Sequence, residues 1–111
     1  MSDPPIQVVQ RGTVTLVTVT GEIDYSAADE VERRIVGEDG GGAVIVDLTG
    51  VTFIDSTCLR ALVSARDSLE KAGRTLVLVP GSTVERLLTL TGLDGDFTIA
   101  SSVDDAIASV G

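Results

Sequence analysis

Residues 43–48 (AVIVDL) constrain the fold of this chain more than any other stretch, because five of the six side chains are apolar. A strand that is buried on one face alternates polar and apolar residues. A strand that is buried on both faces reads as a nearly continuous apolar run, which is typical of a parallel sheet between helices. Residues 75–79 (TLVLV) repeat the pattern. We therefore expect two central parallel strands covered by helices.

Amphipathic helical patterns separate the expected strands. Residues 57–72 place apolar side chains at helical spacing and are followed by Gly73, which predicts a long helix ending there. Similar patterns predict shorter helices over 26–36, from 82 to 92, and from 101 onward. The segments Ser26–Asp29 and Ser82–Glu85 each match a capping box, so we expect them to begin their helices.

The N-terminal part is rich in β-forming residues. Residues 6–10 and 13–20 flank Gly12, a pattern that predicts a hairpin. We expect residues 21–24 to break the second strand and Gly50 and Thr52 to lie in the loop after the third strand. Residues 97–99 suit a short edge strand. The glycine-rich segment 37–42 is expected to be a flexible turn, because a phosphate-binding loop would follow a strand and open a helix.

These patterns together predict an α/β fold with one domain over residues 1–111. The sheet is expected to be mixed, with an N-terminal hairpin, parallel βαβ units and about four helices. Residues 1–5 are expected to form a disordered tail.

Composition excludes several classes of function. The net charge is −9 and the basic residues form no cluster, so we expect no nucleic-acid or anionic-membrane partner. The chain has no histidine, which rules out Ser-His-Asp triads, Cys-His nucleophile pairs, phosphohistidine relays and His-ligated metals. A single cysteine cannot form an internal disulfide. We found no signal-peptide pattern and no apolar run approaching ~20 residues, so we expect a cytoplasmic protein without a membrane span.

The candidate functional residue is Ser56, which follows Asp55 where an apolar strand gives way to a helix. Functional groups in open α/β sheets gather at such strand ends. Serine is also a favoured helix N-cap, and position alone favours that structural role. Thr57 is a minor alternative as a phosphate acceptor. Cys58 shares the apolar helix face, so we expect it to be a small core residue rather than a reactive thiol.

A phosphate on Ser56 would add about −1.5 to −2 charges. The helix N-terminus tolerates this charge, so the fold need not break. The adjacent loop offers no basic side chain to neutralise it. A hydrated phosphate would therefore oppose docking of a surface that fits the neutral hydroxyl, and a loss of ~3 kcal/mol would weaken binding roughly a hundredfold.

Three acids, Asp24, Asp47 and Asp55, also lie at or near expected strand ends. Such a cluster could hold Mg²⁺ for phosphoaspartate chemistry, which also requires a nearby lysine. The only lysine, Lys71, is expected at the far end of the long helix. We therefore favour local roles for these acids, with Asp24 as a helix cap and Asp47 as an acceptor for loop N–H groups, and expect no metal site.

Residues 21–24 (GEID) and 46–59 (VDLTGVTFIDSTCL) resemble a STAS domain of the bacterial anti-sigma-factor antagonist class. The resemblance covers essentially the whole chain. In that family the antagonist binds an anti-sigma factor that is also a serine kinase, and thereby frees a sigma factor. The kinase then phosphorylates a serine, which ends binding, and a serine phosphatase restores it. The matching serine is Ser56, and the family's glycine two positions later is Cys58 here.

The resemblance implies a regulatory binding protein rather than an enzyme, without catalytic residues or cofactors of its own; ATP and Mg²⁺ belong to the partner kinase. We expect a partner-binding surface made of Glu22, Asp24, Tyr25, Asp55, Ser56 and Thr57. The alternative is a STAS subunit of another regulatory or transport assembly, such as a stress-signalling complex or a lipid-transport system.

Overall fold

The elements follow one another in the predicted order: a hairpin of two strands first, and then helices and strands in alternation. The computed structural model describes residues 5–37 and 42–110. Within these ranges the elements are β1 (Ile6–Arg11), β2 (Val14–Ile23), the 3₁₀ turn η1 (Tyr25–Ala27), α1 (Ala28–Val36), β3 (Val44–Ile54), α2 (Ser56–Lys71), β4 (Leu76–Val79), α3 (Gly81–Thr91), the 3₁₀ turn η2 (Asp94–Asp96), β5 (Thr98–Ile99) and α4 (Val103–Val110).

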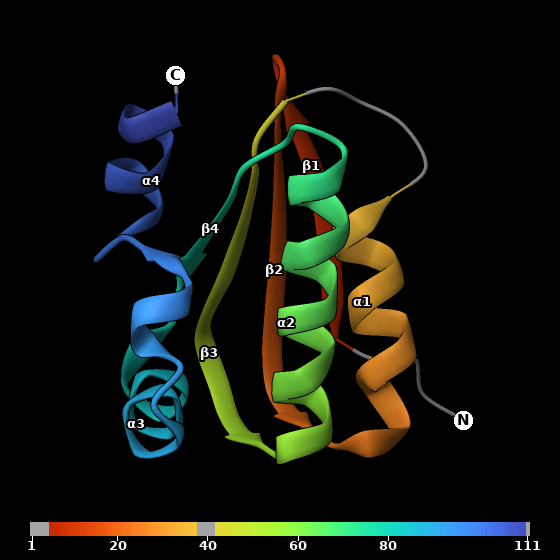
Figure 1. The fold of residues 1–111 in the computed structure, drawn as a ribbon, viewed down its shortest axis with the longest axis vertical. Coiled ribbons are helices and arrows are strands. Elements are labelled where there is room, and N and C mark those ends of the chain that lie inside the picture. The colour runs from red at the N-terminus through yellow and green to blue at the C-terminus, as the bar shows by residue number, and fades with distance from the viewer. Residues whose placement is uncertain (1–4, 38–41, 111) are drawn as a thin grey trace.

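The five strands form one mixed sheet in the order β1-β2-β3-β4-β5. Strands β1 and β2 form the predicted antiparallel hairpin, and each later strand runs parallel to its predecessor. Because β2, β3 and β4 are parallel, their carboxyl ends meet at one edge of the sheet. In Figure 1 this edge lies at the bottom, where β3 leads into α2.

The two faces of the sheet carry separate apolar clusters. In β3, Val44, Val46 and Leu48 belong to the larger cluster, to which α1, α2 and α3 also contribute. Ile45 points to the other side, into a smaller cluster that α4 completes through Ala106. Both predicted apolar runs are therefore strands buried on both faces. Helices α1 and α2 lie side by side over one face of the sheet (Figure 1).

Two predicted strand ends were wrong in the same way. Residues 21–23 do not break the second strand, and Gly50 and Thr52 do not lie in a loop, because β2 continues to Ile23 and β3 to Ile54. The two extensions pair with each other across register shifts at Thr18/Thr20 and Gly21/Glu22. These bulges let both strands continue beyond the residues that looked like breaks.

Two predicted helix caps were also wrong. Ser26 does not cap α1, because its backbone N–H and its hydroxyl both donate to Asp24 Oδ1, at 2.9 and 2.5 Å. Helix α3 begins at Gly81 after Pro80, with no side-chain cap.

Two predicted flexible segments fall largely outside the described residues. Most of the expected tail and residues 38–41 of the glycine-rich turn lie there. Of the tail, Pro5 is described, and its carbonyl accepts a hydrogen bond from Thr20 N at 3.1 Å.

Candidate functional site

The candidate site forms where β2 and β3 end side by side. Glu22 pairs with Phe53 and Ile23 pairs with Ile54, so the two strands deliver η1 and the start of α2 to the same place. Buried Ile23 and Ile54 anchor the two strand ends in the core. The sheet therefore brings together two segments that are some thirty residues apart in the sequence.

Asp55 joins these two segments through its carboxylate. One oxygen, Oδ1, accepts a hydrogen bond from the Cys58 backbone N–H at 3.0 Å and caps α2. The other, Oδ2, accepts one from the Tyr25 N–H at 2.8 Å. Asp55, rather than Ser56, is thus the N-cap of the long helix. Sequence position suggested a cap here but assigned it to the neighbouring residue.

Ser56 is the first residue of α2, and its side chain is exposed. Because Asp55 provides the cap, the Ser56 hydroxyl has no hydrogen-bond partner among the described residues. Thr57 is exposed beside it. A free hydroxyl on the first turn is open to a modifying enzyme, and the helix N-terminus tolerates the negative charge of a phosphate.

Asp24 caps η1, in agreement with its expected local role. The hydroxyl of Ser26, followed by the Ser26 backbone N–H, lowers the pKa of Asp24 below its ordinary value of 3.8, because both bonds stabilise the carboxylate. Asp24 and Glu22 are exposed, as Tyr25 is, and all three lie where β2 ends. This edge therefore carries negative charge at neutral pH.

Two exposed aromatic side chains flank the acids and the serine. Tyr25 is 73% exposed and Phe53 is 48% exposed, although the whole chain has only three aromatic residues. Tyr25 was expected in the site, whereas Phe53 was missed. Its position two residues before Asp55, in a chain so poor in aromatics, was the signal in the sequence. We call Glu22, Asp24, Tyr25, Phe53, Asp55, Ser56 and Thr57 the switch surface.

Cys58 is a buried core residue, as predicted. Its thiol is fully buried and lies 2.9 Å from the carbonyl oxygen of Asp24, to which it donates. Burial, together with the nearby carboxylate of Asp55, raises the pKa of Cys58 to about 12. A thiol with this pKa is almost entirely protonated at neutral pH and is a poor nucleophile.

The acids do not converge on a metal site. The Asp47 side chain accepts hydrogen bonds from the backbone N–H and hydroxyl of Thr49, at 3.0 and 2.7 Å, as its expected local role requires. Lys71 is the last residue of α2, at the opposite end from Ser56. Across residues 5–37 and 42–110, no group of three or more acidic or cysteine side chains is arranged to hold a metal ion.

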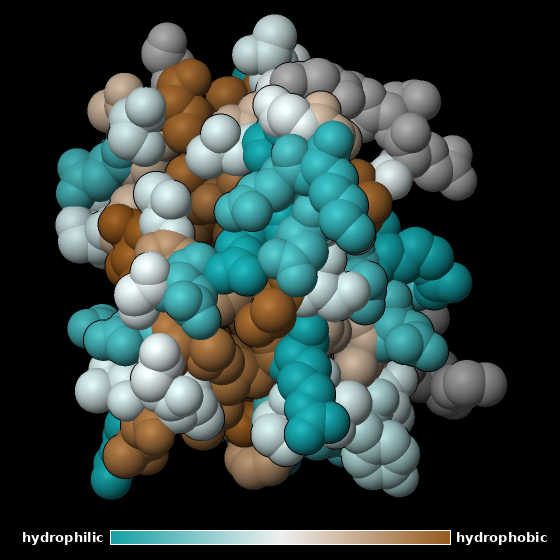
Figure 2. Space-filling view, in the orientation of Figure 1, coloured by the Kyte–Doolittle hydropathy of each residue, from teal (hydrophilic) through white to brown (hydrophobic). Residues whose placement is uncertain are grey.

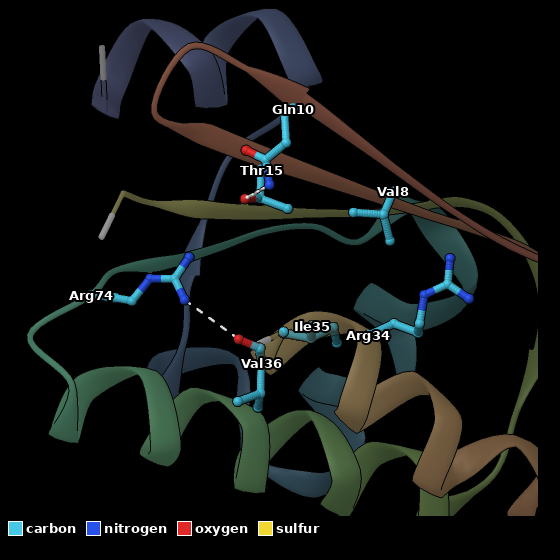
Figure 3. A pocket seen from close by; sticks show the side chains of 8 residues that line it. Val8, Gln10, Thr15, Arg34, Ile35, Val36 and Arg74 are labelled. Atoms are coloured by element: carbon cyan, nitrogen blue, oxygen red, sulfur yellow. Dashed lines mark hydrogen bonds between the residues drawn. The ribbon is translucent and has the colours of Figure 1, made fainter. Parts of the chain in front are cut away.

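A hollow of about 300 Å³ lies at the other end of the molecule, between β1, β2 and the end of α1 (Figure 3). Polar side chains that line it form hydrogen bonds within the protein. Arg74 Nε donates to the Gly42 carbonyl at 2.9 Å and Arg74 Nη1 to the Val36 carbonyl at 3.4 Å, while Gln10 Nε2 donates to Thr15 Oγ1 at 2.9 Å. These contacts close the C-terminus of α1 and hold the hairpin, a structural role remote from Ser56.

The part of the chain that the structure describes contains no helix that is both long enough and apolar enough to cross a bilayer. The surface over α2 is largely hydrophilic, with apolar atoms showing on the side toward α3 (Figure 2).

Comparison with known proteins gives a consistent result. The family model described as "STAS domain" matches residues 5–106. The anti-sigma-F factor antagonist RsfB of Mycobacterium tuberculosis H37Rv is 30% identical over 107 residues, covering 95% of this chain and 88% of that protein. A solved anti-sigma factor antagonist from Mycobacterium paratuberculosis superimposes with a TM-score of 0.79 at 32% identity, over 95% of this chain and 92% of that one.

The same fold also occurs in a protein that is named for transport rather than for sigma-factor regulation. A sulfate transporter family protein from Wolinella succinogenes has a TM-score of 0.79 at 23% identity, with coverage of 92% of this chain and 88% of that chain. At this identity the likeness concerns the fold alone.

Proposed function

The chain belongs to the STAS domain family, and we propose that it acts as an anti-sigma-factor antagonist whose binding is switched off by phosphorylation of Ser56. The name of the relative with 30% identity over nearly the whole chain supports the general role. The observation that carries the switch is the free, exposed hydroxyl of Ser56 on a capped helix. The proposed role is regulatory, and the phosphoryl transfer belongs to the partner kinase, with its ATP and Mg²⁺.

The switch surface supports binding of the unmodified form. Tyr25 and Phe53 offer apolar area, and aromatic side chains are enriched among residues that dominate binding energy. The carboxylates of Glu22 and Asp24 favour a partner with basic groups around an apolar pocket. Asp55, which is expected to contact the partner, also has a structural role, because each of its oxygens accepts a hydrogen bond from a backbone N–H group. We assign it to holding the surface in shape.

Phosphorylation would act at the centre of this surface. A phosphate adds about −1.5 to −2 charges and a strongly held hydration shell. It would stand at the same end of the sheet as Asp24, whose carbonyl contacts Cys58 in the first turn of α2. A partner whose surface fits this acid and a small hydroxyl would therefore meet extra bulk and a charge that it cannot desolvate. The backbone of α2 would remain in place, because the helix N-terminus tolerates the anion.

The test is capture of the partner followed by a kinase reaction. The immobilised protein is incubated with lysate of its native host, and bound proteins are identified by mass spectrometry. We expect an anti-sigma factor with a kinase domain. Addition of ATP and Mg²⁺ should release the wild-type complex and place a phosphate on Ser56, and a serine phosphatase should restore binding. The Ser56→Ala protein should remain bound, while the matched control Thr57→Ala should be released like wild type.

Two results would contradict the proposal. A phosphate that maps to Thr57, or release of Ser56→Ala by ATP, would show that Ser56 is not the switch. Capture of scaffold or membrane-transport components without a kinase would instead favour a STAS subunit of another assembly.

A further inference from the structure

Arg60 is an exposed cation one helical turn after Ser56. Both residues belong to α2, which runs without interruption from Ser56 to Lys71. Side chains four residues apart lie on the same helix face, with Cβ atoms about 5–6 Å apart. Because helical side chains lean toward the N-terminus, a phosphate on Ser56 would be within reach of the Arg60 guanidinium. In the unmodified protein the Arg60 side chain borders a shallow hollow together with Ser64 and Asp67.

Among the residues that the structure describes, no acid pairs with Arg60. Its neighbours three and four residues away on α2 are Ser56, Thr57, Val63 and Ser64, all uncharged. The acid farther along the same face, Asp67, is paired with Arg66: its Oδ1 lies 2.8 Å from Arg66 Nη2. In the described parts of the chain, Arg60 takes part in no ion pair.

We infer that Arg60 is an internal receptor for the phosphate on Ser56, an inference that rests on the proposed function. A guanidinium offers a planar pair of N–H donors that matches two phosphate oxygens. An anion placed N-terminal to a cation by four residues is also the favoured orientation on a helix. The loop before the helix lacks a basic side chain, as the sequence indicated, but the helix itself supplies one.

The pairing would fix the position of the phosphate in the form that does not bind the partner. Without Arg60 the phosphate would be free to rotate away from the surface into solvent. With Arg60 it is held over the first turn of α2, next to Tyr25 and Asp55, where it blocks the switch surface. The acids around this turn are Asp55, the N-cap of α2, Asp24, the N-cap of η1, and Glu22 near the end of β2. Their charges oppose the dianion, which makes the cation of Arg60 more important.

The experiment measures the second pKa of the phosphate, which is about 6 in a free phosphoserine. Phosphoserine is installed at position 56 of the full chain during translation, so no kinase is needed, and its ³¹P signal is titrated by NMR. A nearby cation favours the dianion and so lowers this pKa. We expect Arg60→Gln to raise it by roughly 0.3 pH unit at low salt, the size of one exposed pair on a helix.

Control variants distinguish a specific contact between Arg60 and the phosphate from the general effect of removing one positive charge. Arg86→Gln removes the same charge from an exposed site on α3 and should leave the phosphate pKa unchanged within about 0.1. Arg60→Lys keeps the charge without the planar donors and should lie between wild type and Arg60→Gln. The difference should vanish in about 1 M salt, where the screening length is only ~3 Å.

A second measurement needs no substitution. The Arg60 Nε–H resonance of the wild-type chain should shift when Ser56 carries phosphate, while that of Arg86 should not. Equal phosphate pKa values in wild type and Arg60→Gln, or an unmoved Arg60 resonance, would overturn the inference. Neither outcome bears on whether a kinase modifies Ser56. Failure of the Arg60–phosphate pairing can therefore be distinguished from failure of the proposed function.

Discussion

At the scale of single residues, two roles are divided between neighbours: Asp55 caps α2, and Ser56 carries a free hydroxyl. From sequence position alone, both roles would be assigned to Ser56. Asp55 provides the helix cap and also holds the Tyr25 backbone, which keeps the two halves of the switch surface together. Ser56 is thereby left with a free hydroxyl. This division lets the serine change its charge without loss of the cap, so modification need not unfold the helix.

The division predicts different stability effects for neighbouring substitutions. Asp55→Ala removes both acceptors and should lower the free energy of unfolding by about 1–2 kcal/mol. Ser56→Ala should change it by less than about 0.5 kcal/mol, because the hydroxyl caps nothing. Asp55→Asn, which keeps one good acceptor, should fall between them. Urea denaturation measures all three, and equal losses for Asp55→Ala and Ser56→Ala would contradict the assignment of the cap.

The lowered pKa of Asp24 predicts that the stability of the fold depends on pH through this one residue. Its pKa lies below the ordinary value of 3.8, chiefly because the Ser26 hydroxyl donates to it and secondarily because of the Ser26 N–H. A pKa that is lower in the folded than in the unfolded state stabilises the fold above the unfolded pKa, and this contribution is lost as the pH falls through the folded value.

Ser26→Ala should therefore raise the pKa of Asp24 toward 3.8, and the stability that Asp24 contributes above its folded-state pKa should shrink. NMR titration of the Asp24 carboxyl carbon measures the pKa directly. Ser102→Ala, a change at the start of α4 far along the chain, serves as the matched control. A pKa of Asp24 that does not respond to loss of the Ser26 hydroxyl would show that this hydrogen bond is not the main cause.

At the scale of elements, the site depends on two strands that extend beyond the expected ends. The apolar runs in β3 and β4 could be recognised from sequence because burial on both faces leaves a local pattern. The extensions of β2 and β3 could not, because each exists only through pairing with the other across bulges. Gly21 and Gly50 look like breaks when the strands are considered singly.

The parts of the candidate site that could be predicted are likewise those that leave a local pattern in the sequence. Ser56, Asp24 and Asp55 stand out in local motifs, and their positions at one sheet edge follow from parallel strands. The link from Asp55 to the Tyr25 N–H spans thirty residues, and no local pattern encodes it. Phe53 was missed because its exposure depends on the bulged end of β3.

Helix α3 provides a prediction about packing between elements. It begins at Gly81, which has φ +72°, and a Cβ there would lie 2.7 Å from the Cα of Thr49 in β3. Gly81→Ala combines this clash with a left-handed backbone and should cost roughly 2–3 kcal/mol or more. Gly92→Ala is the matched control, with φ +75° but open space around it, and should cost only about 1–2 kcal/mol.

Thermal or urea unfolding of both variants measures the difference. Equal costs for Gly81→Ala and Gly92→Ala would mean that the start of α3 does not press on β3 as closely as the structure shows.

At the scale of the whole molecule, the fold acts as a stable support for one edge. The apolar clusters lie on both sides of the sheet, whereas the switch surface gathers at the ends of β2 and β3. The net charge of −9 favours a basic partner. The cost of a phosphate at the contact would therefore come from its bulk and from the loss of its strongly held hydration shell. A phosphate on Ser56 would thus alter affinity while leaving the fold in place.

The most direct test compares the affinity of the captured anti-sigma factor for two forms of the chain. One form is unmodified and the other carries phosphoserine at position 56; phosphoserine at the exposed Ser68, far along α2, supplies the same charge as a control. Calorimetry should show binding roughly a hundredfold weaker for the form modified at Ser56, a loss of ~3 kcal/mol, and near-normal binding for the Ser68 form. Equal affinity of the unmodified and Ser56-modified forms would contradict the switch.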